Sequence, residues 1–154
     1  MKIRDAESGD FEQLLKLKLD SKEEERKLNK ELEPVAKVKK HYAEYLNNDL
    51  KSAYRKLLVA TDKSDIVGVI LVKLFRSLKV AGYKKRGYLS NLYVVPEYRK
   101  QGVGRKLTAK AISWLKSVGA DEATLEIYEN NLAARMLYEK LGFTTYSVKM
   151  MKRI

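Results

Sequence analysis

The sequence contains no cysteine and a single histidine among its 154 residues. Without cysteine there can be no disulfide framework, no thiolate metal site and no cysteine nucleophile. One histidine is too few for a histidine-based metal cluster, so we expect no metal centre. Cysteine chemistry and a histidine-based metal cluster are therefore excluded.

Long apolar runs are also missing. No stretch approaches the roughly 18 apolar residues that a membrane span needs, and the N-terminal residues 1–7 lack the apolar core of a signal peptide. We therefore expect a cytoplasmic protein. The chain has two prolines and no Pro-rich linker, repeat or low-complexity tail. Its length predicts one domain, residues 1–154, large enough to bury a core.

Acidic residues are scarce in one segment. Residues 73–106 hold ten lysines and arginines but a single glutamate, so nine of the twelve excess positive charges lie there. Such a concentration favours an anion site over a uniformly solvated basic surface. A phosphate-bearing ligand and a nucleic acid would both match, and charge alone does not separate them.

A strand, a glycine loop and a helix follow one another inside and just beyond this segment. Residues 88–95 are dense in aromatic and β-branched side chains and are closed by Pro96, which predicts a strand. Apolar residues then recur every three or four positions from Val103 to Val118, which predicts a helix. Gly102 and Gly104 lie where the strand turns into the helix. Backbone N–H groups at the helix start can therefore approach an anion such as a pyrophosphate.

Other phosphate-binding loops do not match these residues. A dinucleotide fingerprint needs glycine at position 107, where the chain has Leu107, and a P-loop needs Gly-Lys-Ser/Thr, which is absent. What remains is the pattern Arg-x-x-Gly-x-Gly from Arg99 to Gly104. This pattern resembles the acyl-CoA pyrophosphate loop of the GNAT superfamily of N-acetyltransferases.

A second motif supports the same resemblance. Asn131, Tyr138 and the pair Gly142-Phe143 stand in Asn-x-x-Ala-x-x-x-Tyr-x-x-x-Gly-Phe, which resembles the closing helix and strand of this superfamily. Two motifs in the right order and spacing make chance agreement hard to obtain. The resemblance covers residues 88–143 and is nearest to the branch that acetylates protein N-termini, including ribosomal-protein alanine acetyltransferases.

The remaining segments complete a mixed α+β chain. Before the glycine loop we expect an edge strand at 2–6, a helix from Ser8, a solvated helical stretch at 21–33, a helix opened by Pro34, a hairpin of strands at 56–61 and 66–75, and a basic connection at 77–87. After the helix that follows the loop we expect a strand at 123–128 parallel to the strand at 88–95, a helix at 132–141, and a closing strand or hairpin at 144–150.

The resemblance implies the GNAT fold. In that fold a mostly antiparallel, twisted sheet of six to seven strands contains one splayed parallel pair and is flanked by about four helices. Residues 1–55 would form the variable helical region on the acceptor side, and residues 88–143 would form the acetyl-CoA-binding core of the single domain.

The resemblance also implies acetyl-CoA as cosubstrate and no metal. The backbone of Leu92, Tyr93 and Val94 would hold the pantetheine arm, and an amide near Leu92 or Tyr93 would polarise the thioester carbonyl. Asn131 would hydrogen-bond the arm from the side of the other strand, and Tyr138 would contact the cofactor. The pyrophosphate would be cradled by Arg99, Lys100, Gln101, Gly102, Val103, Gly104 and Arg105.

Acetyl transfer to an amine needs a base, because an amine is mostly protonated at neutral pH, and the departing thiolate benefits from a proton donor. Tyr138 matches the donor of the family, although it could simply pack in the core. Glu126, five residues before Asn131, matches the base of the N-terminal branch, although it could simply pair with a lysine. Tyr88 stands where some members carry a glutamate, and His41 lies in the helical region that borders the acceptor pocket. Either remains an alternative base.

The predicted function is acetyl transfer from acetyl-CoA to a primary amine, with a protein N-terminus as one candidate. A small amine of the polyamine type is an alternative, although the positive charge near the site would repel polycations. A non-catalytic CoA-binding domain and a basic nucleic-acid-binding module are further alternatives. No residue names the acceptor, and a monomer and a homodimer are both open.

Overall fold

One mixed sheet organises the described part of the chain, which in this computed structural model comprises residues 1–75, 85–152 and 154. The sheet has five strands in the order β1-β2-β3-β4-β5. They are β1 (Lys2–Asp5), β2 (Arg55–Asp62), β3 (Asp65–Phe75), β4 (Arg86–Val94) and β5 (Glu122–Thr124). Neighbouring strands are antiparallel except β4 and β5, which run parallel.

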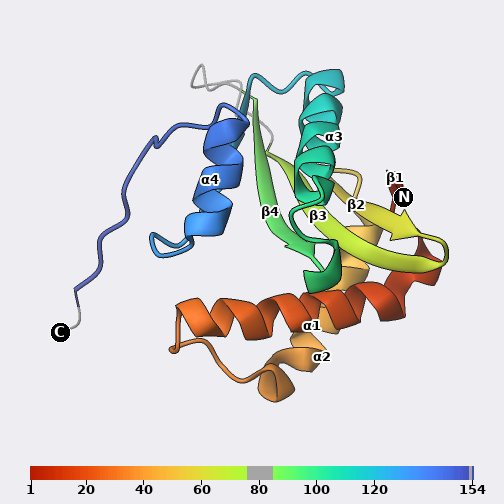
Figure 1. Cartoon of the computed structure of the whole chain (residues 1–154), viewed down its shortest axis with the longest axis horizontal. Coiled ribbons are helices and arrows are strands. Elements are labelled where there is room, and N and C mark those ends of the chain that lie inside the picture. The colour runs from red at the N-terminus through yellow and green to blue at the C-terminus, as the bar shows by residue number, and fades with distance from the viewer. Residues whose placement is uncertain (76–84, 153) are drawn as a thin grey trace.

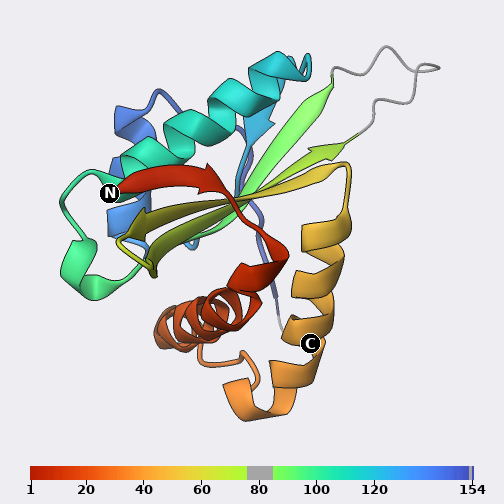
Figure 2. The same cartoon turned by 90° about the vertical axis from the view of Figure 1, so that its right-hand side faces the viewer.

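Helices cover both faces of this sheet. They are α1 (Phe11–Leu28), α2 (Val35–Lys51), α3 (Val103–Ser117) and α4 (Leu132–Lys140), with the short helices η1 (Ser8–Asp10) and η3 (Pro96–Tyr98) before α1 and α3. Helices α1 and α2 lie on one face and α3 lies on the other (Figures 1 and 2). None of the helices in residues 1–75, 85–152 and 154 combines the length and apolar character that crossing a bilayer requires.

The central strand β3 explains why the helices form two layers. Every residue from Ile66 to Val72 is buried, so this strand needs cover on both faces. Val69 and Leu71 pack with the leucines of α1 and α2, whereas Ile70 and Val72 pack with α3. Each fully buried aliphatic side chain stabilises the fold by about 1.5–3 kcal/mol.

A bulge in β4 reverses which side chains face α1 and α2. Val69 pairs with Tyr93, but Leu71 pairs with Ser90, so β4 carries one extra residue against β3. Asn91 lies inside this bulge with a φ of 52°. Consequently Leu89 packs with α3, while Tyr93, four residues later, packs with α1 and α2. The bulge therefore turns the Tyr93 side chain, near the end of β4, towards α1.

The parallel pairing of β4 and β5 is short. The ladder joins Arg86–Tyr88 to Glu122–Thr124, and β4 continues for six residues beyond it. The predicted strand at 123–128 is therefore too long. Hydrogen bonds explain the departure, because the Tyr128 hydroxyl donates to Glu25 and the Asn130 side chain donates to the Leu28 carbonyl of α1.

The mixed α/β GNAT architecture and its four helices agree with the prediction, but the described residues form five strands instead of six to seven. The predicted closing strand at 144–150 is wrong. The tail extends away from the sheet (Figure 1), and Tyr146, Val148 and Met150 are exposed, so its alternating side chains have no strand beside them in the part described. Residues 77–84 of the predicted basic connection lie outside the described residues.

Candidate active site

The glycine loop joins η3 to α3. Lys100 and Gly102 have φ values of 59° and 79°, which turn the chain tightly before the helix begins at Val103. Gly102 is the N-cap residue, so the N–H groups of the first turn of α3 receive no side-chain cap from it. A side-chain carbon at Gly102 would meet nothing within 4 Å. The loop therefore presents backbone amides to open space.

Two of the predicted pyrophosphate contacts are already engaged inside the protein. The Arg99 guanidinium donates to Glu24 of α1 at 2.7 Å and to the Val94 carbonyl at 2.8 Å, and the Gln101 side chain donates to the Glu97 carbonyl. These bonds tie the loop to β4 and to α1. Val103 is buried in the core, so only its backbone could meet a ligand.

Exposed positive charge nevertheless surrounds the loop. Lys100, Arg105 and Lys106 are all exposed. Gly104 is half-buried, and a side-chain carbon there would lie 3.5 Å from Leu137 of α4. The start of α3 is thus packed against α4 on one side and open, with a cationic rim, on the other. This arrangement fits an anion at a helix N-terminus.

Tyr138 lies buried in α4, close to the place where β4 and β5 separate. Its ring meets the Phe143 ring edge-on, with 5.5 Å between the centroids. Burial, with a smaller contribution from Tyr88, raises the pKa of Tyr138 to about 12. Burial also raises the pKa of Tyr88, with Glu126 acting in the same direction. The structure therefore brings Tyr88 into electrostatic reach of both Tyr138 and Glu126, and Glu126 is exposed.

Asn131 has a visible structural role. Its side-chain carbonyl accepts a hydrogen bond from the Ala134 amide at 3.1 Å and so caps α4. The predicted contact with a pantetheine arm would have to use its other side-chain atoms. His41, by contrast, is exposed on α2 and does not line the cavity described next.

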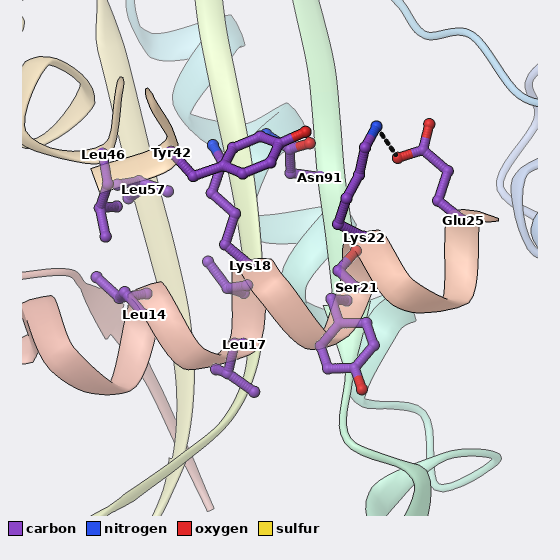
Figure 3. Close-up of a pocket in the computed structure, with 12 residues that line it drawn as sticks. Leu14, Leu17, Lys18, Ser21, Lys22, Glu25, Tyr42, Leu46, Leu57 and Asn91 are labelled. Atoms are coloured by element: carbon purple, nitrogen blue, oxygen red, sulfur yellow. Dashed lines mark hydrogen bonds and ion pairs between the residues drawn. The ribbon is translucent and has the colours of Figure 1, made fainter. Parts of the chain in front are cut away.

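A cavity of about 210 Å³ lies between α1, α2 and the sheet. Figure 3 shows that Lys18, Lys22 and Glu25 point to the same side of α1. Asn91 and Tyr93 of the bulged β4 also border it, so it touches the strand segment that is predicted to hold the acyl arm. It is lined by Leu14, Leu17, Lys18, Ser21, Lys22, Glu25, Tyr42, Leu46, Leu57, Val69, Asn91 and Tyr93.

Sequence reasoning missed the charged residues of this cavity. The stretch 21–33 was expected to be solvated, yet the side chain of Lys22 is only 15% exposed. Its Nζ pairs with Glu25 at 3.0 Å, and Glu25 also accepts the hydroxyl of Tyr128 at 3.1 Å. A usable signal existed, because Lys18, Lys22 and Glu25 recur at helical spacing after the buried Leu14.

Comparisons with known proteins agree with this geometry. The model of the Acetyltransferase (GNAT) family matches residues 18–143. The chain therefore belongs to the acetyltransferase (GNAT) family. The predicted family and its nearness to the N-terminal acetyltransferase branch are confirmed.

Two curated relatives match parts of the chain. N-alpha-acetyltransferase 30 of Schizosaccharomyces pombe is 39% identical over 90 residues, which is 57% of this chain and 57% of that protein. Mycothiol acetyltransferase of Thermobispora bispora is 44% identical over 70 residues, which is 44% of this chain and 24% of that protein. The matches thus span about half or less of these relatives.

Two solved structures share the fold over nearly the whole chain. A transcriptional regulator from Bacillus halodurans C-125 superimposes with a TM-score of 0.80 at 24% identity, covering 99% of each chain. AAC(6')-Iy in complex with a bisubstrate analogue, CoA-S-monomethyl-acetylneamine, superimposes with a TM-score of 0.76 at 16% identity, covering 99% of this chain and 97% of that one. At these identities the likeness concerns the fold.

Proposed function

We propose that the protein transfers an acetyl group from acetyl-CoA to a primary amine, with the N-terminus of a peptide as the preferred acceptor. The observation that carries the proposal is the separation of β4 from β5 beyond Tyr88. Three features lie near this separation or along the part of β4 that follows it: the glycine loop, the buried Tyr138 and the cavity under α1. The relative N-alpha-acetyltransferase 30 supports the choice of a peptide N-terminus.

The residues present fit acetyl-CoA. The first-turn amides of α3, the open space above Gly102 and the exposed Lys100 and Arg105 suit a pyrophosphate. Arg99 acts indirectly in this proposal, because its bonds to Glu24 and Val94 hold the loop in place. Backbone groups of Leu92–Val94 pair with the pantetheine arm, and an amide near Tyr93 polarises the thioester carbonyl.

Acetyl-CoA, when bound, supplies the acetyl group as a thioester. Tyr138 then serves as the donor to the leaving sulfur. Because its pKa is raised to about 12, its phenol keeps its proton at neutral pH and donates a hydrogen bond to the sulfur as negative charge develops. Its buried position, held by Phe143, fixes the direction of this hydrogen bond.

Glu126 is the proposed base. It is exposed, lies two residues beyond the end of β5 and acts electrostatically on Tyr88, so in this proposal it takes a proton from an incoming ammonium directly or through water. Tyr88 suits this role less well, since its pKa is raised and its phenol therefore stays protonated. The exposed His41 lies outside the residues that line the cavity.

A small-molecule amine is the second candidate acceptor. The match to mycothiol acetyltransferase and the fold shared with a structure that holds an aminoglycoside-type bisubstrate analogue favour it. A panel that contains peptide N-termini, polyamines and aminoglycosides, assayed for release of free CoA, would separate the two. Turnover of small amines with none for peptides would overturn the preferred acceptor.

Calorimetric titration of acetyl-CoA tests the cofactor site. In Gly102→Glu a carboxylate occupies the open space above the loop, and we expect affinity to fall about 100-fold because like charges repel at a desolvated site. Gly142→Glu is the matched control, since Gly142 also has a left-handed φ, at 85°, and a side chain there also meets nothing within 4 Å. Equal binding by the wild type and Gly102→Glu would contradict the site.

Steady-state kinetics test the base. Glu126→Gln is expected to lower kcat about 100-fold at neutral pH and to recover partly as the pH rises and more of the amine is deprotonated. Glu129→Gln, an exposed carboxylate of the same loop, is the control. Unchanged turnover in Glu126→Gln would remove this residue from the mechanism.

A further inference from the structure

Two lysines of α1 point into the cavity instead of into solvent. The side chains of Lys18 and Lys22 are 16% and 15% exposed, whereas Lys16 on the same helix is 76% exposed. Lysine is almost never buried without a partner, because removing its charge from water is costly. Figure 3 shows both lysines rising from α1 on the side of Tyr42 and Asn91.

The described carboxylates nearby do not balance these charges. Asp49 lies 3.9 Å from the Lys18 ammonium, but it is bound more closely by Arg55 at 2.6 Å. Glu25 neutralises Lys22 while also accepting the hydroxyl of Tyr128. Asp49 and Glu25 thus face four nearby cations, and Lys18 has the longest ion-pair distance of those that pair with them. The cations are Lys18, Lys22, Arg55 and Lys73.

Burial lowers the pKa of Lys18, and the charges of Lys73, Arg55 and Lys22 act in the same direction. Only Asp49 opposes the shift among the causes. An added anion beside Lys18 would therefore reduce the free-energy cost of burying its ammonium charge. The Tyr42 ring, 5.6 Å from the ammonium, supplies part of the missing stabilisation.

Apolar and polar parts of the cavity are separated. Leu14, Leu46 and Leu57 surround one end, while the lysines, Tyr42 and Asn91 gather at the other (Figure 3). Asn91 is the bulge residue of β4 and is two positions from Tyr93. The cationic part of the cavity is therefore adjacent to the strand segment at which transfer is proposed.

We propose that this cavity selects an acceptor amine that carries a carboxylate close to it, and that Lys18 and Lys22 bind the carboxylate. The proposal deepens the proposed function and rests on it for the position of the amine. The apolar end of the cavity accepts a hydrophobic side chain of the same acceptor. Two acceptors share this chemistry: a peptide whose second residue is acidic, and a free apolar amino acid with its α-carboxylate.

Matched acceptors test the charge requirement. The peptides Met-Glu-Ala-Ala-amide and Met-Gln-Ala-Ala-amide differ only in the second side chain, and methionine and methionine amide differ only in the α-carboxylate. In whichever pair contains the true acceptor, we expect the acidic member to show about tenfold higher kcat/KM than the neutral member. A tenfold change corresponds to the contribution of one charge-assisted hydrogen bond. The pair that responds identifies the source of the carboxylate.

Variants connect the preference to the cavity. Lys18→Met and Lys22→Met are expected to abolish the tenfold preference, and Lys22→Glu is expected to reverse it in favour of Met-Lys-Ala-Ala-amide. Lys16→Met removes an equal charge from the exposed side of α1 and should leave the preference intact. Loss of the preference in Lys16→Met as well would attribute it to long-range charge and overturn the cavity site.

Direct binding separates this proposal from the proposed function. Calorimetry with each peptide and amino acid, in the presence of CoA, measures selection without turnover. Tighter binding of the acidic member that is lost in Lys18→Met supports the cavity even if no acceptor is acetylated, in which case only the proposed function fails. Equal binding of acidic and neutral members by the folded wild-type protein overturns the carboxylate site, whatever the rates of acetylation.

Discussion

The two faces of the sheet are built on different principles. On the α3 face, Leu58, Ile70, Leu107 and Ala111 are completely buried. The polar side chain of Thr108 is also fully buried there, and it donates to the Gly104 carbonyl within its own helix. On the α1 and α2 face, leucines surround a cavity that also contains buried charge. One face packs tightly beneath the glycine loop, and the other contains the cavity in which we propose that the acceptor binds.

This difference predicts where the fold is most sensitive. Leu107→Ala removes a fully buried side chain from the tightly packed face, and we expect a loss of about 4 kcal/mol in the free energy of unfolding. Leu17→Ala, whose side chain borders the cavity, should lose about 2 to 3 kcal/mol because it already adjoins empty space. Urea denaturation measures both. Equal losses would show that the two faces are packed alike.

The next effect concerns catalysis. Tyr138→Phe keeps the edge-on ring contact with Phe143 but removes the donor, so we expect kcat to fall about 100-fold, with the stability nearly unchanged. Because the pKa of Tyr138 is raised to about 12, the wild-type rate should show no loss from ionisation of this group below about pH 11. A pH–rate profile measures this, and a small effect of the substitution would assign Tyr138 to packing alone.

A smaller effect is expected where α1 begins. Arg4 of β1 makes two hydrogen bonds to Asp10, at 2.6 and 2.8 Å, and these lower the pKa of Asp10 below 3.8. A lowered pKa adds stability above the unfolded-state value and loses it as pH falls through the folded-state value. Asp10→Asn should therefore cost about 1 kcal/mol at pH 7, and this cost should shrink as the pH falls through the lowered folded-state pKa of Asp10.

Thermal unfolding of the wild type and Asp10→Asn between pH 2 and pH 7 tests this. Asp20→Asn, which removes a partly exposed carboxylate of α1, should change stability by less than about 0.5 kcal/mol. A difference between wild type and Asp10→Asn that stays constant down to pH 2 would exclude the ion pair as its cause.

The smallest effect has the opposite sign. Lys18→Met replaces a buried charge with an apolar side chain of similar size, while Arg55 still neutralises Asp49, so stability should stay level or rise by about 1 kcal/mol. Because the pKa of Lys18 is lowered, the penalty of its charge is complete below that pKa and disappears towards pH 10.5. Any stabilisation should therefore shrink in alkaline buffer. Clear destabilisation of Lys18→Met at neutral pH would indicate that the charge of Lys18 stabilises the fold.

The loop of Gly102 and Gly104, the hairpin of β2 and β3, and the helix between Asn131 and Gly142 followed from sequence patterns alone. Each depends on neighbours along the chain: glycine at a left-handed φ, alternating apolar residues, or a side chain that caps its own helix. Patterns of this kind are visible within a few residues. The prediction of a strand at 144–150 is wrong because it too used only a local pattern. Alternation of apolar residues supplies no partner strand.

What the sequence determined by itself is the order of elements and the family-like core around the glycine loop. Only the tertiary structure decided how the acceptor side is built: the bulge at Asn91, the bonds of Arg99 to Glu24 across 75 positions and of Tyr128 to Glu25 across 103, and the burial of Lys18 and Lys22. The physical reason is distance along the chain. Local conformational preferences depend on short patterns of neighbouring residues. The partner of a charged side chain depends instead on which remote segments the folded sheet brings together.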